Sequence, residues 1–134
     1  MASGCFLGFD FGLKRIGVAV GQRITQTASP LETLNANNGI PDWKDVKRLV
    51  KDWHPEALVV GVPLNMDDSE SHITVKTREF IVLMAEQVKL PIYTVDERLT
   101  TKAVGYELER LGKKNLKKDD ALAACVILES YLMS

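Results

Sequence analysis

The chain has 134 residues and a formal net charge of −1 at pH 7, with 17 basic and 18 acidic side chains. This length suits one domain, so we expect a single domain over residues 1–134 and exclude activities that need two large lobes. Hydrophobic residues make up 46% of the chain, as in a globular protein, and no apolar run approaches the roughly 18 residues of a membrane helix. We therefore expect a cytoplasmic protein with no membrane partner, in which any nucleic-acid binding comes from a local charged patch.

The first third of the chain predicts three strands and a break. Apolar runs at 5–11 and 16–20 flank a short polar stretch, which indicates a hairpin. The next stretch, 25–34, contains Pro30, which suits an edge strand because proline cannot donate to a sheet ladder. A polar break follows at 35–39. Helical spacing then predicts a helix from Trp43 to Trp53, with both tryptophans in the core.

The remainder predicts alternating strands and helices. Residues 57–62 form a β-branched run suited to a strand covered on both faces, and 91–95 form the next strand. Between them a helix begins near Ile73 and has an apolar face, and a further helix follows Thr100 or Thr101 and ends at Gly112. The last helix spans 119–132. A meander followed by such units predicts an α/β sheet flanked by helices.

Two cysteines bear on the cellular compartment. Cys5 and Cys125 each lie in an apolar run, where a buried free thiol is the expected state. We therefore expect both thiols to be reduced, as in the cytosol.

Carboxylates occur at three places where they demand an explanation. Asp10 lies in an apolar strand, where an ionised carboxylate is costly without a metal or a partner such as Lys14 or Arg15. The Asp96-Glu97 pair follows a predicted strand, and ligands of open α/β sheets bind beyond such strand ends. The third place is Asp119-Asp120, which opens the last helix, where capping would account for one of the two acids.

These carboxylates suit a hard cation. Small residues at 121, 123 and 124 would let the start of the last helix approach the sheet and Asp10. Oxygen ligands without a Cys or His cluster favour Mg²⁺ or Mn²⁺ over zinc, and such sites serve phosphoryl chemistry. The segment 98–118 adds seven basic residues against two acidic ones, a net charge of +5 that suits a polyanionic substrate or a solvated surface.

Four blocks occur in order along the chain: 9–21 (FDFGLKRIGVAVG), 60–67 (VGVPLNMD), 96–101 (DERLTT) and 120–124 (DALAA). Together they resemble the YqgF (RuvX-like) family, whose members are described as Holliday-junction resolvases and as pre-16S rRNA nucleases. The resemblance implies an RNase H-like fold with a mixed five-stranded sheet. One departure is Asp68, which stands where the family usually has glycine, so a positive φ there would strain this loop.

The resemblance also implies a site. Its catalytic carboxylates would be Asp10, Glu97 and Asp120, holding Mg²⁺ or Mn²⁺, with Asp96 as a ligand or an orienting neighbour. Other side chains in and near the matching blocks would contact the substrate. The substrate phosphates would be contacted by the cationic side chains of Lys14, Arg15, Arg98 and Lys102. Thr100 or Thr101 would cap a helix or donate a hydrogen bond to the substrate.

Four functions are compatible with this sequence. The leading hypothesis is a metal-dependent endonuclease acting on structured RNA, in maturation of the 5′ end of pre-16S rRNA. The second keeps the site but cuts four-way DNA junctions, which favours a two-fold symmetric enzyme, whereas the chain is expected to be a monomer or a weak homodimer. The third is an ATPase of the actin and sugar-kinase type, and the fourth a non-catalytic RNA-binding factor in ribosome assembly.

Overall fold

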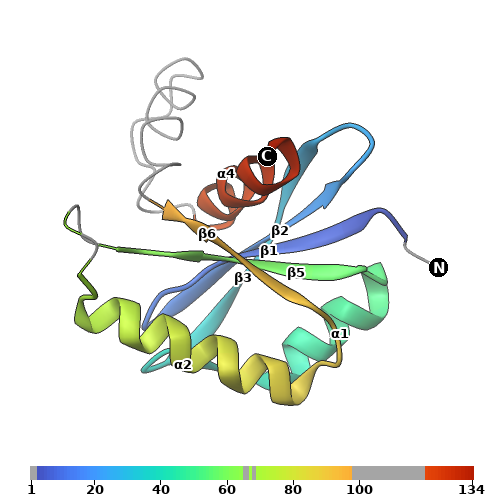
Figure 1. Cartoon of the computed structure of the whole chain (residues 1–134). Coiled ribbons are helices and arrows are strands. Elements are labelled where there is room, and N and C mark those ends of the chain that lie inside the picture. The colour runs from blue at the N-terminus through green and yellow to red at the C-terminus, as the bar shows by residue number, and fades with distance from the viewer. Residues whose placement is uncertain (1–2, 65–66, 68, 98–119) are drawn as a thin grey trace.

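The computed structural model of the chain describes residues 3–64, 67, 69–97 and 120–134. Its centre is a six-stranded mixed sheet in the order β4-β3-β2-β1-β5-β6 (Figure 1). The strands are β1 (Cys5–Asp10), β2 (Arg15–Gln22), β3 (Thr27–Asn37), β4 (Ile40–Pro41), β5 (Ala57–Val62) and β6 (Ile92–Asp96). The helices are α1 (Trp43–Trp53), α2 (His72–Gln87) and α4 (Asp120–Met133).

The predicted combination of a meander and parallel strands is confirmed. β1, β2 and β3 are antiparallel neighbours, whereas β5 runs parallel to β1 and β6 runs parallel to β5. A sixth strand, β4, pairs only with the last two residues of β3. Between them Asn38 and Gly39 both have positive φ, the conformation of a two-residue hairpin turn, so the predicted polar break is a tight turn. Pro30 lies in β3, outside the short stretch that β4 covers.

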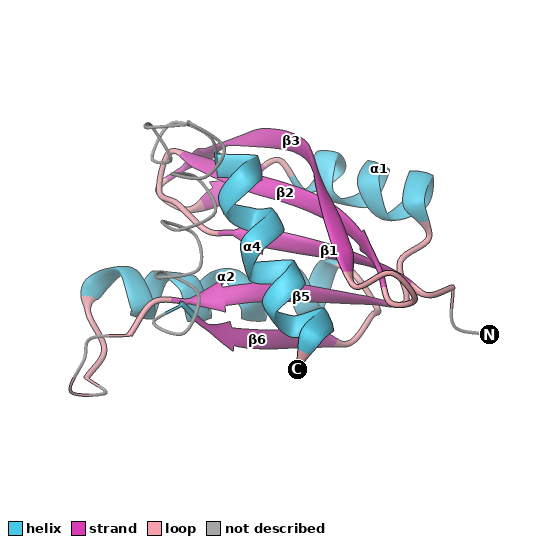
Figure 2. Cartoon of the chain, turned by 90° about the horizontal axis from the view of Figure 1, so that it is seen from above, coloured by secondary structure: helices cyan, strands magenta, loops and turns pink. Residues whose placement is uncertain are grey.

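Helices cover both faces of the sheet. α1 and α2 lie on one face and α4 lies on the other, as the two views together make clear (Figures 1 and 2). Asp42 caps α1 by accepting from the amide of Lys44. Ser71 and Thr74 form a capping box at the start of α2. The Thr74 hydroxyl also donates to the carbonyl of Pro63, which ties the loop after β5 to this helix.

Strand alternation separates two apolar clusters. In β1, Leu7 and Phe9 face α1 and α2, whereas Phe6 faces α4. The same parity puts Leu58 on the α2 side of β5 and Val59 on the α4 side. Every residue of β5 is buried, as expected for a strand covered on both faces. Asp10, an even-numbered residue of β1, therefore shares the face that α4 covers.

Several local predictions can be compared with the structure. Trp43 stacks on Phe80 with ring centroids 5.8 Å apart, but the prediction for Trp53 is wrong: it is 41% exposed at the end of α1, where the chain turns into the next strand. Cys5 and Cys125 are buried free thiols, as predicted. The predicted helix near 101–111 lies outside the described residues. None of the helices in the described part of the chain has the length and apolar character that a membrane span requires.

Candidate active site

The three predicted acidic positions meet at one edge of the sheet. β1 and β6 both run parallel to β5, so Asp10 ends its strand at the same edge as Glu97, the residue after β6. Asp120 is the first residue of α4 and comes from the helix that covers this side of the sheet. The charges of Glu97 and Asp120 both act on Asp10, as expected when three carboxylates converge.

Gly17 brings the start of α4 against the sheet. It is the cross-strand partner of Asp10 in the antiparallel pair of β1 and β2. A Cβ atom on Gly17 would lie 1.9 Å from the carbonyl oxygen of Asp120, so only glycine leaves room for the helix here. Ala121 is buried immediately behind Asp120. The predicted close approach of the helix to Asp10 is therefore confirmed, and Gly17 is the reason on the sheet side.

Gly61 makes the corresponding space for Glu97. A Cβ atom on this residue of β5 would lie 2.7 Å from Oε1 of Glu97 and 2.6 Å from Cδ1 of Ile127. The glutamate side chain thus passes over the bare backbone of β5 toward Asp10. Neither Gly17 nor Gly61 was identified from the sequence. The signal that could have found them is a glycine inside an apolar strand, because the missing side chain leaves space for a neighbouring element.

The Asp10 and Glu97 carboxyls share a hydrogen bond that Asp10 donates. Burial is the largest cause that raises the pKa of Asp10, to about 8, and the charges of Glu97 and Asp120 raise it further. Burial also raises the pKa of Glu97. At neutral pH the pair therefore holds a proton at Asp10, because two ionised carboxylates in one buried site repel each other.

Glu97 joins the site, and Asp96 acts on it from nearby. Val95 packs in the α4 cluster, so alternation along β6 directs Asp96 to the opposite face of the sheet. The charge of Asp96 contributes to the raised pKa of Glu97. The choice between the two acids, which the sequence left open, thus favours Glu97 as a member of the cluster and Asp96 as its neighbour.

Arg15 is the cation of the described site. Its Nε donates to Oδ2 of Asp120 at 2.9 Å, with the Arg15 side chain 55% exposed and that of Asp120 19% exposed. Arg15 therefore pairs with Asp120 and not with Asp10, the pairing considered from the sequence. Lys14 is exposed in the turn before β2. The other predicted substrate contacts lie outside the described residues: Arg98, Thr100, Thr101, Lys102 and the rest of the basic segment 98–118.

The three carboxylates are suitable ligands for a hard divalent cation, although they are not arranged around one. Three carboxylates from three elements are the ligand type that Mg²⁺ and Mn²⁺ prefer. Within the described residues, no three His, Cys, Asp or Glu side chains are already arranged to hold a metal ion. Asp10 and Glu97 share a hydrogen bond, and Oδ2 of Asp120 accepts from Arg15.

Comparison with known proteins assigns the family. The family model RuvX, described as Holliday junction resolvase, matches residues 4–134. The chain belongs to the RuvX family. A relative from Legionella pneumophila (strain Lens), named "Putative pre-16S rRNA nuclease", is 50% identical over 135 residues, which cover 98% of this chain and 97% of the relative. A relative of the same name from Pseudomonas fluorescens is 49% identical over 136 residues, covering 98% and 94%.

Solved structures similar to this RuvX-family chain confirm the fold. Thermus thermophilus RuvC in complex with its Holliday junction substrate superimposes with a TM-score of 0.60 at 17% identity, covering 96% of this chain and 92% of that one. The fowlpox virus Holliday junction resolvase gives a TM-score of 0.56 at 11% identity, covering 96% and 97%. These likenesses support the RNase H-like α/β architecture implied by the sequence resemblance.

Proposed function

We propose that this chain is a metal-dependent endonuclease that hydrolyses phosphodiester bonds during maturation of the 5′ end of pre-16S ribosomal RNA, in the cytoplasm. The convergence of Asp10, Glu97 and Asp120 at one sheet edge carries the proposal. Its substrate follows from the relatives named for pre-16S rRNA, which share half of the residues of this chain over almost its full length.

In this proposal Asp10, Glu97 and Asp120 hold Mg²⁺ or Mn²⁺, which when bound activates water and stabilises the leaving oxygen of a phosphodiester. Asp10 must first release its proton, so the pair with Glu97 changes from sharing a hydrogen bond to offering two anionic oxygens. Asp96 adds negative charge beside Glu97 and strengthens the attraction for a cation. The buried side of the cluster, under α4, keeps these carboxylates in a fixed orientation.

Substrate phosphates are the proposed ligands of the cationic side chains. Arg15 is half exposed, so its guanidinium can turn from Asp120 to a phosphate without uncovering buried surface. Lys14 precedes Arg15 and is exposed in the turn before β2. We assign Arg98 and Lys102 to the same role, and Thr100 and Thr101 to donation to the substrate or to helix capping, on the motif that contains them.

A second candidate function is cleavage of four-way DNA junctions. The description of the family model favours it, and the solved RuvC structure contains a Holliday junction. The same carboxylates would serve this reaction, because the chemistry at the phosphodiester does not depend on the sugar. The two functions differ in substrate and not in site residues, so they are separated by offering both substrates to one preparation.

The test is cleavage of end-labelled pre-16S rRNA, naked and within precursor ribosomal particles, in Mn²⁺ and in EDTA. A labelled four-way DNA junction is assayed alongside. The variants are Asp10→Asn and Glu97→Gln, and Asp52→Asn, an exposed carboxylate on α1, is the matched control. We expect Mn²⁺-dependent cleavage of the RNA that both site variants lose and the control keeps.

Three results would overturn the proposal. Cleavage by Asp10→Asn at the parental rate would remove the carboxylates from the reaction. Metal-dependent cleavage of the junction alone would establish the second candidate function. RNA binding that persists in EDTA and in Asp10→Asn, with no cleavage of any substrate, would identify a non-catalytic RNA-binding factor.

A further inference from the structure

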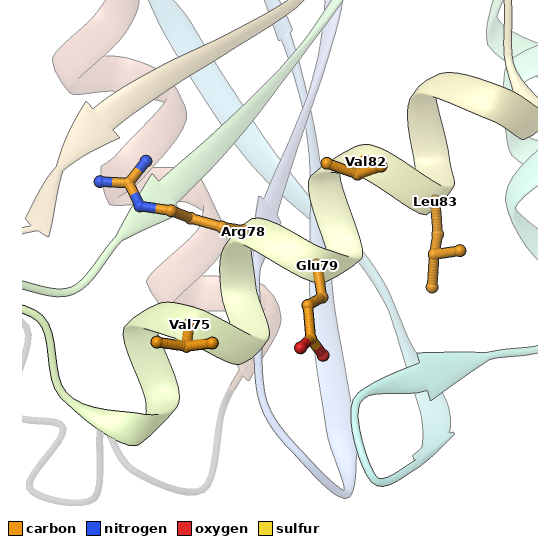
Figure 3. Close-up of a pocket in the computed structure, with 5 residues that line it drawn as sticks. All are labelled: Val75, Arg78, Glu79, Val82 and Leu83. Atoms are coloured by element: carbon orange, nitrogen blue, oxygen red, sulfur yellow. The ribbon is translucent and has the colours of Figure 1, made fainter.

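Two features of the described structure lie outside the carboxylate cluster. One is a pocket on the outer surface of α2, lined by Val75, Arg78, Glu79, Val82 and Leu83 (Figure 3). α2 covers the face of the sheet opposite α4, so the sheet separates this pocket from the start of α4 (Figure 2). The other feature is the tip of the β3–β4 hairpin, residues 36–41, which contacts the turn before Arg15 and therefore lies next to the site.

Two backbone hydrogen bonds join the hairpin tip to the β1–β2 turn, residues 11–14. Regular pairing of β2 with β3 begins at Arg15. Before that point the amide of Ala36 donates to the carbonyl oxygen of Lys14 at 2.8 Å, and the amide of Gly39 donates to that of Leu13 at 2.9 Å. The tip therefore holds the carbonyls of the two residues that precede Arg15. β4 adds two residue pairs to the sheet, so it shapes this tip more than it extends the sheet.

Glycine residues allow this close contact. Gly39 is buried with φ +85°, a conformation that glycine adopts without strain, and a Cβ atom there would lie 2.6 Å from Cζ of Phe11. The Phe11 ring, at the start of the turn, packs on the ring of Phe80 with centroids 5.3 Å apart. A Cβ atom on Gly12 would overlap the carbonyl oxygen of Arg15. The β1–β2 turn is thus held on its inner side by the hairpin tip and by the core.

Cationic side chains lie on the outer side and at the end of the turn. Lys14 is exposed, and Arg15 is half exposed with its Nε on Oδ2 of Asp120. A long, half-exposed side chain has many rotamers, and fixing it in one of them costs conformational entropy. A backbone that is already fixed at Leu13 and Lys14 reduces the positions open to the Arg15 guanidinium. Each contact that the guanidinium makes is stronger for that reason.

We propose that Gly39 is a positioning residue for Arg15, and that the hairpin tip supports the β1–β2 turn for this purpose. In the metal-free protein the support keeps the guanidinium on Asp120. With nucleic acid bound, it directs the guanidinium to a substrate phosphate. The inference rests on the proposed function in one respect, because it takes the contact between Arg15 and phosphate from that proposal.

The test measures two affinities of the full chain: the affinity for a pre-16S rRNA fragment in EDTA, and the affinity for Mn²⁺ in calorimetry. The first variant is Gly39→Ala. The second is Ala36→Pro, which removes the amide that donates to Lys14 and leaves Gly39 in place. Arg15→Ala is the reference for complete loss of the guanidinium.

The matched control is Gly4→Ala. Gly4 also has a positive φ, +77°, so alanine there causes the same kind of backbone strain. A Cβ atom on Gly4 would approach Oε1 of Gln22 at 3.9 Å, which is an ordinary contact. Gly4 precedes β1, at the opposite end of this strand from Asp10, so the control should leave both affinities unchanged.

Gly39→Ala should weaken RNA binding about three- to tenfold and tighten Mn²⁺ binding about two- to fivefold, because Arg15 loses its fixed position and Asp120 is freed. Ala36→Pro should change both affinities in the same directions. Adding Gly39→Ala to Arg15→Ala should leave the Mn²⁺ affinity of Arg15→Ala unchanged, since both variants act through one guanidinium. A general loss of fold would weaken both affinities, so opposite directions distinguish positioning from structural damage.

Parental affinities in both variants would overturn the inference, and so would effects of Gly39→Ala and Arg15→Ala on Mn²⁺ binding that add. Circular dichroism establishes whether each variant is folded. If neither variant folds, hydrogen exchange of the parent decides. Slow exchange of the Gly39 and Ala36 amides supports the inference, and exchange as fast as in the exposed β2–β3 turn overturns it.

Failure of the proposed function would give a different result. A parent that neither binds Mn²⁺ nor cleaves RNA would overturn the nuclease, while RNA affinities in EDTA would still test the hairpin tip. A parent that cleaves RNA with Mn²⁺, together with a Gly39→Ala variant that matches it in both affinities, would overturn the inference alone. A parent that binds neither Mn²⁺ nor RNA would overturn both.

Discussion

Replacing Asp10 by asparagine should stabilise the metal-free protein. Asp10 is held at the end of β1 beside Glu97 and Asp120, and burial together with these charges raises its pKa to about 8 from the ordinary 3.8. Asparagine is neutral at every pH, and its amide can donate to Glu97 as the protonated aspartic acid does. The variant therefore removes the cost of keeping a carboxyl protonated, while it retains the hydrogen bond.

The sign and size follow from proton linkage. Between pH 3.8 and about 8 the folded protein holds a proton at Asp10 that the unfolded chain has released. The stability of the metal-free parent is therefore greatest below the unfolded pKa and falls by up to about 1.4 kcal/mol per pH unit until the folded pKa is passed. At pH 7, keeping Asp10 protonated lowers the free energy of unfolding of the parent by at most about 4 kcal/mol. Because Glu97 shares the proton, we expect a gain of about 1–4 kcal/mol for Asp10→Asn.

Urea unfolding in EDTA at pH 5, 7 and 9 measures this gain. The gain in the free energy of unfolding should be small at pH 5, larger at pH 7 and largest at pH 9. In a thermal melt, each kcal/mol of this gain should raise the melting temperature by about 3–5 °C. Asp52→Asn, on the exposed surface of α1, should show no such trend. A variant less stable than the parent at pH 9, or a gain independent of pH, would refute the account of the buried pair.

Three further predictions concern the same site. Gly17→Ala should displace the start of α4, cost about 1–3 kcal/mol and weaken Mn²⁺ binding by at least tenfold in calorimetry, because its Cβ would lie 1.9 Å from the Asp120 carbonyl. Gly21→Ala, whose Cβ would lie 2.9 Å from Cδ2 of Leu128 on α4, should lose less stability and keep Mn²⁺ affinity. An equal loss of affinity in both variants would contradict this placement. Arg15→Ala should tighten Mn²⁺ binding about two- to fivefold, because it frees the Asp120 carboxylate, and it should lower RNA affinity. Unchanged Mn²⁺ affinity would show that the ion pair does not compete with the metal. Finally, Mn²⁺ affinity should rise by up to about tenfold per pH unit until the pKa of Asp10, about 8, is passed, and each binding event should release up to one proton. Calorimetry in buffers of different ionisation enthalpy measures that proton. Binding without proton release would refute a protonated Asp10.

Much of the fold follows from local patterns in the sequence. The apolar runs of β1, β2 and β5 and the helical spacing of α1 and α2 are periodic over whole elements, so their type and order could be predicted. The two-residue strand β4 could not, since it is too short to have a period and depends on the turn at Asn38 and Gly39. Trp53 was misplaced for a related reason: helical spacing identifies a stripe, but not where the core ends along it.

The candidate site divides in the same way. By itself the sequence determined which acids were costly or well placed, namely Asp10 in an apolar strand, the Asp96-Glu97 pair at the end of a strand and the acids that open the last helix. Only the tertiary structure decided that Glu97, and not Asp96, joins Asp10, because Gly61 of β5 leaves space for it. It also decided that Arg15 pairs with Asp120, and that Gly17 lets α4 approach. Such contacts join residues far apart in the chain, and local periodicity contains no information about which distant backbone will fill the space that a glycine leaves.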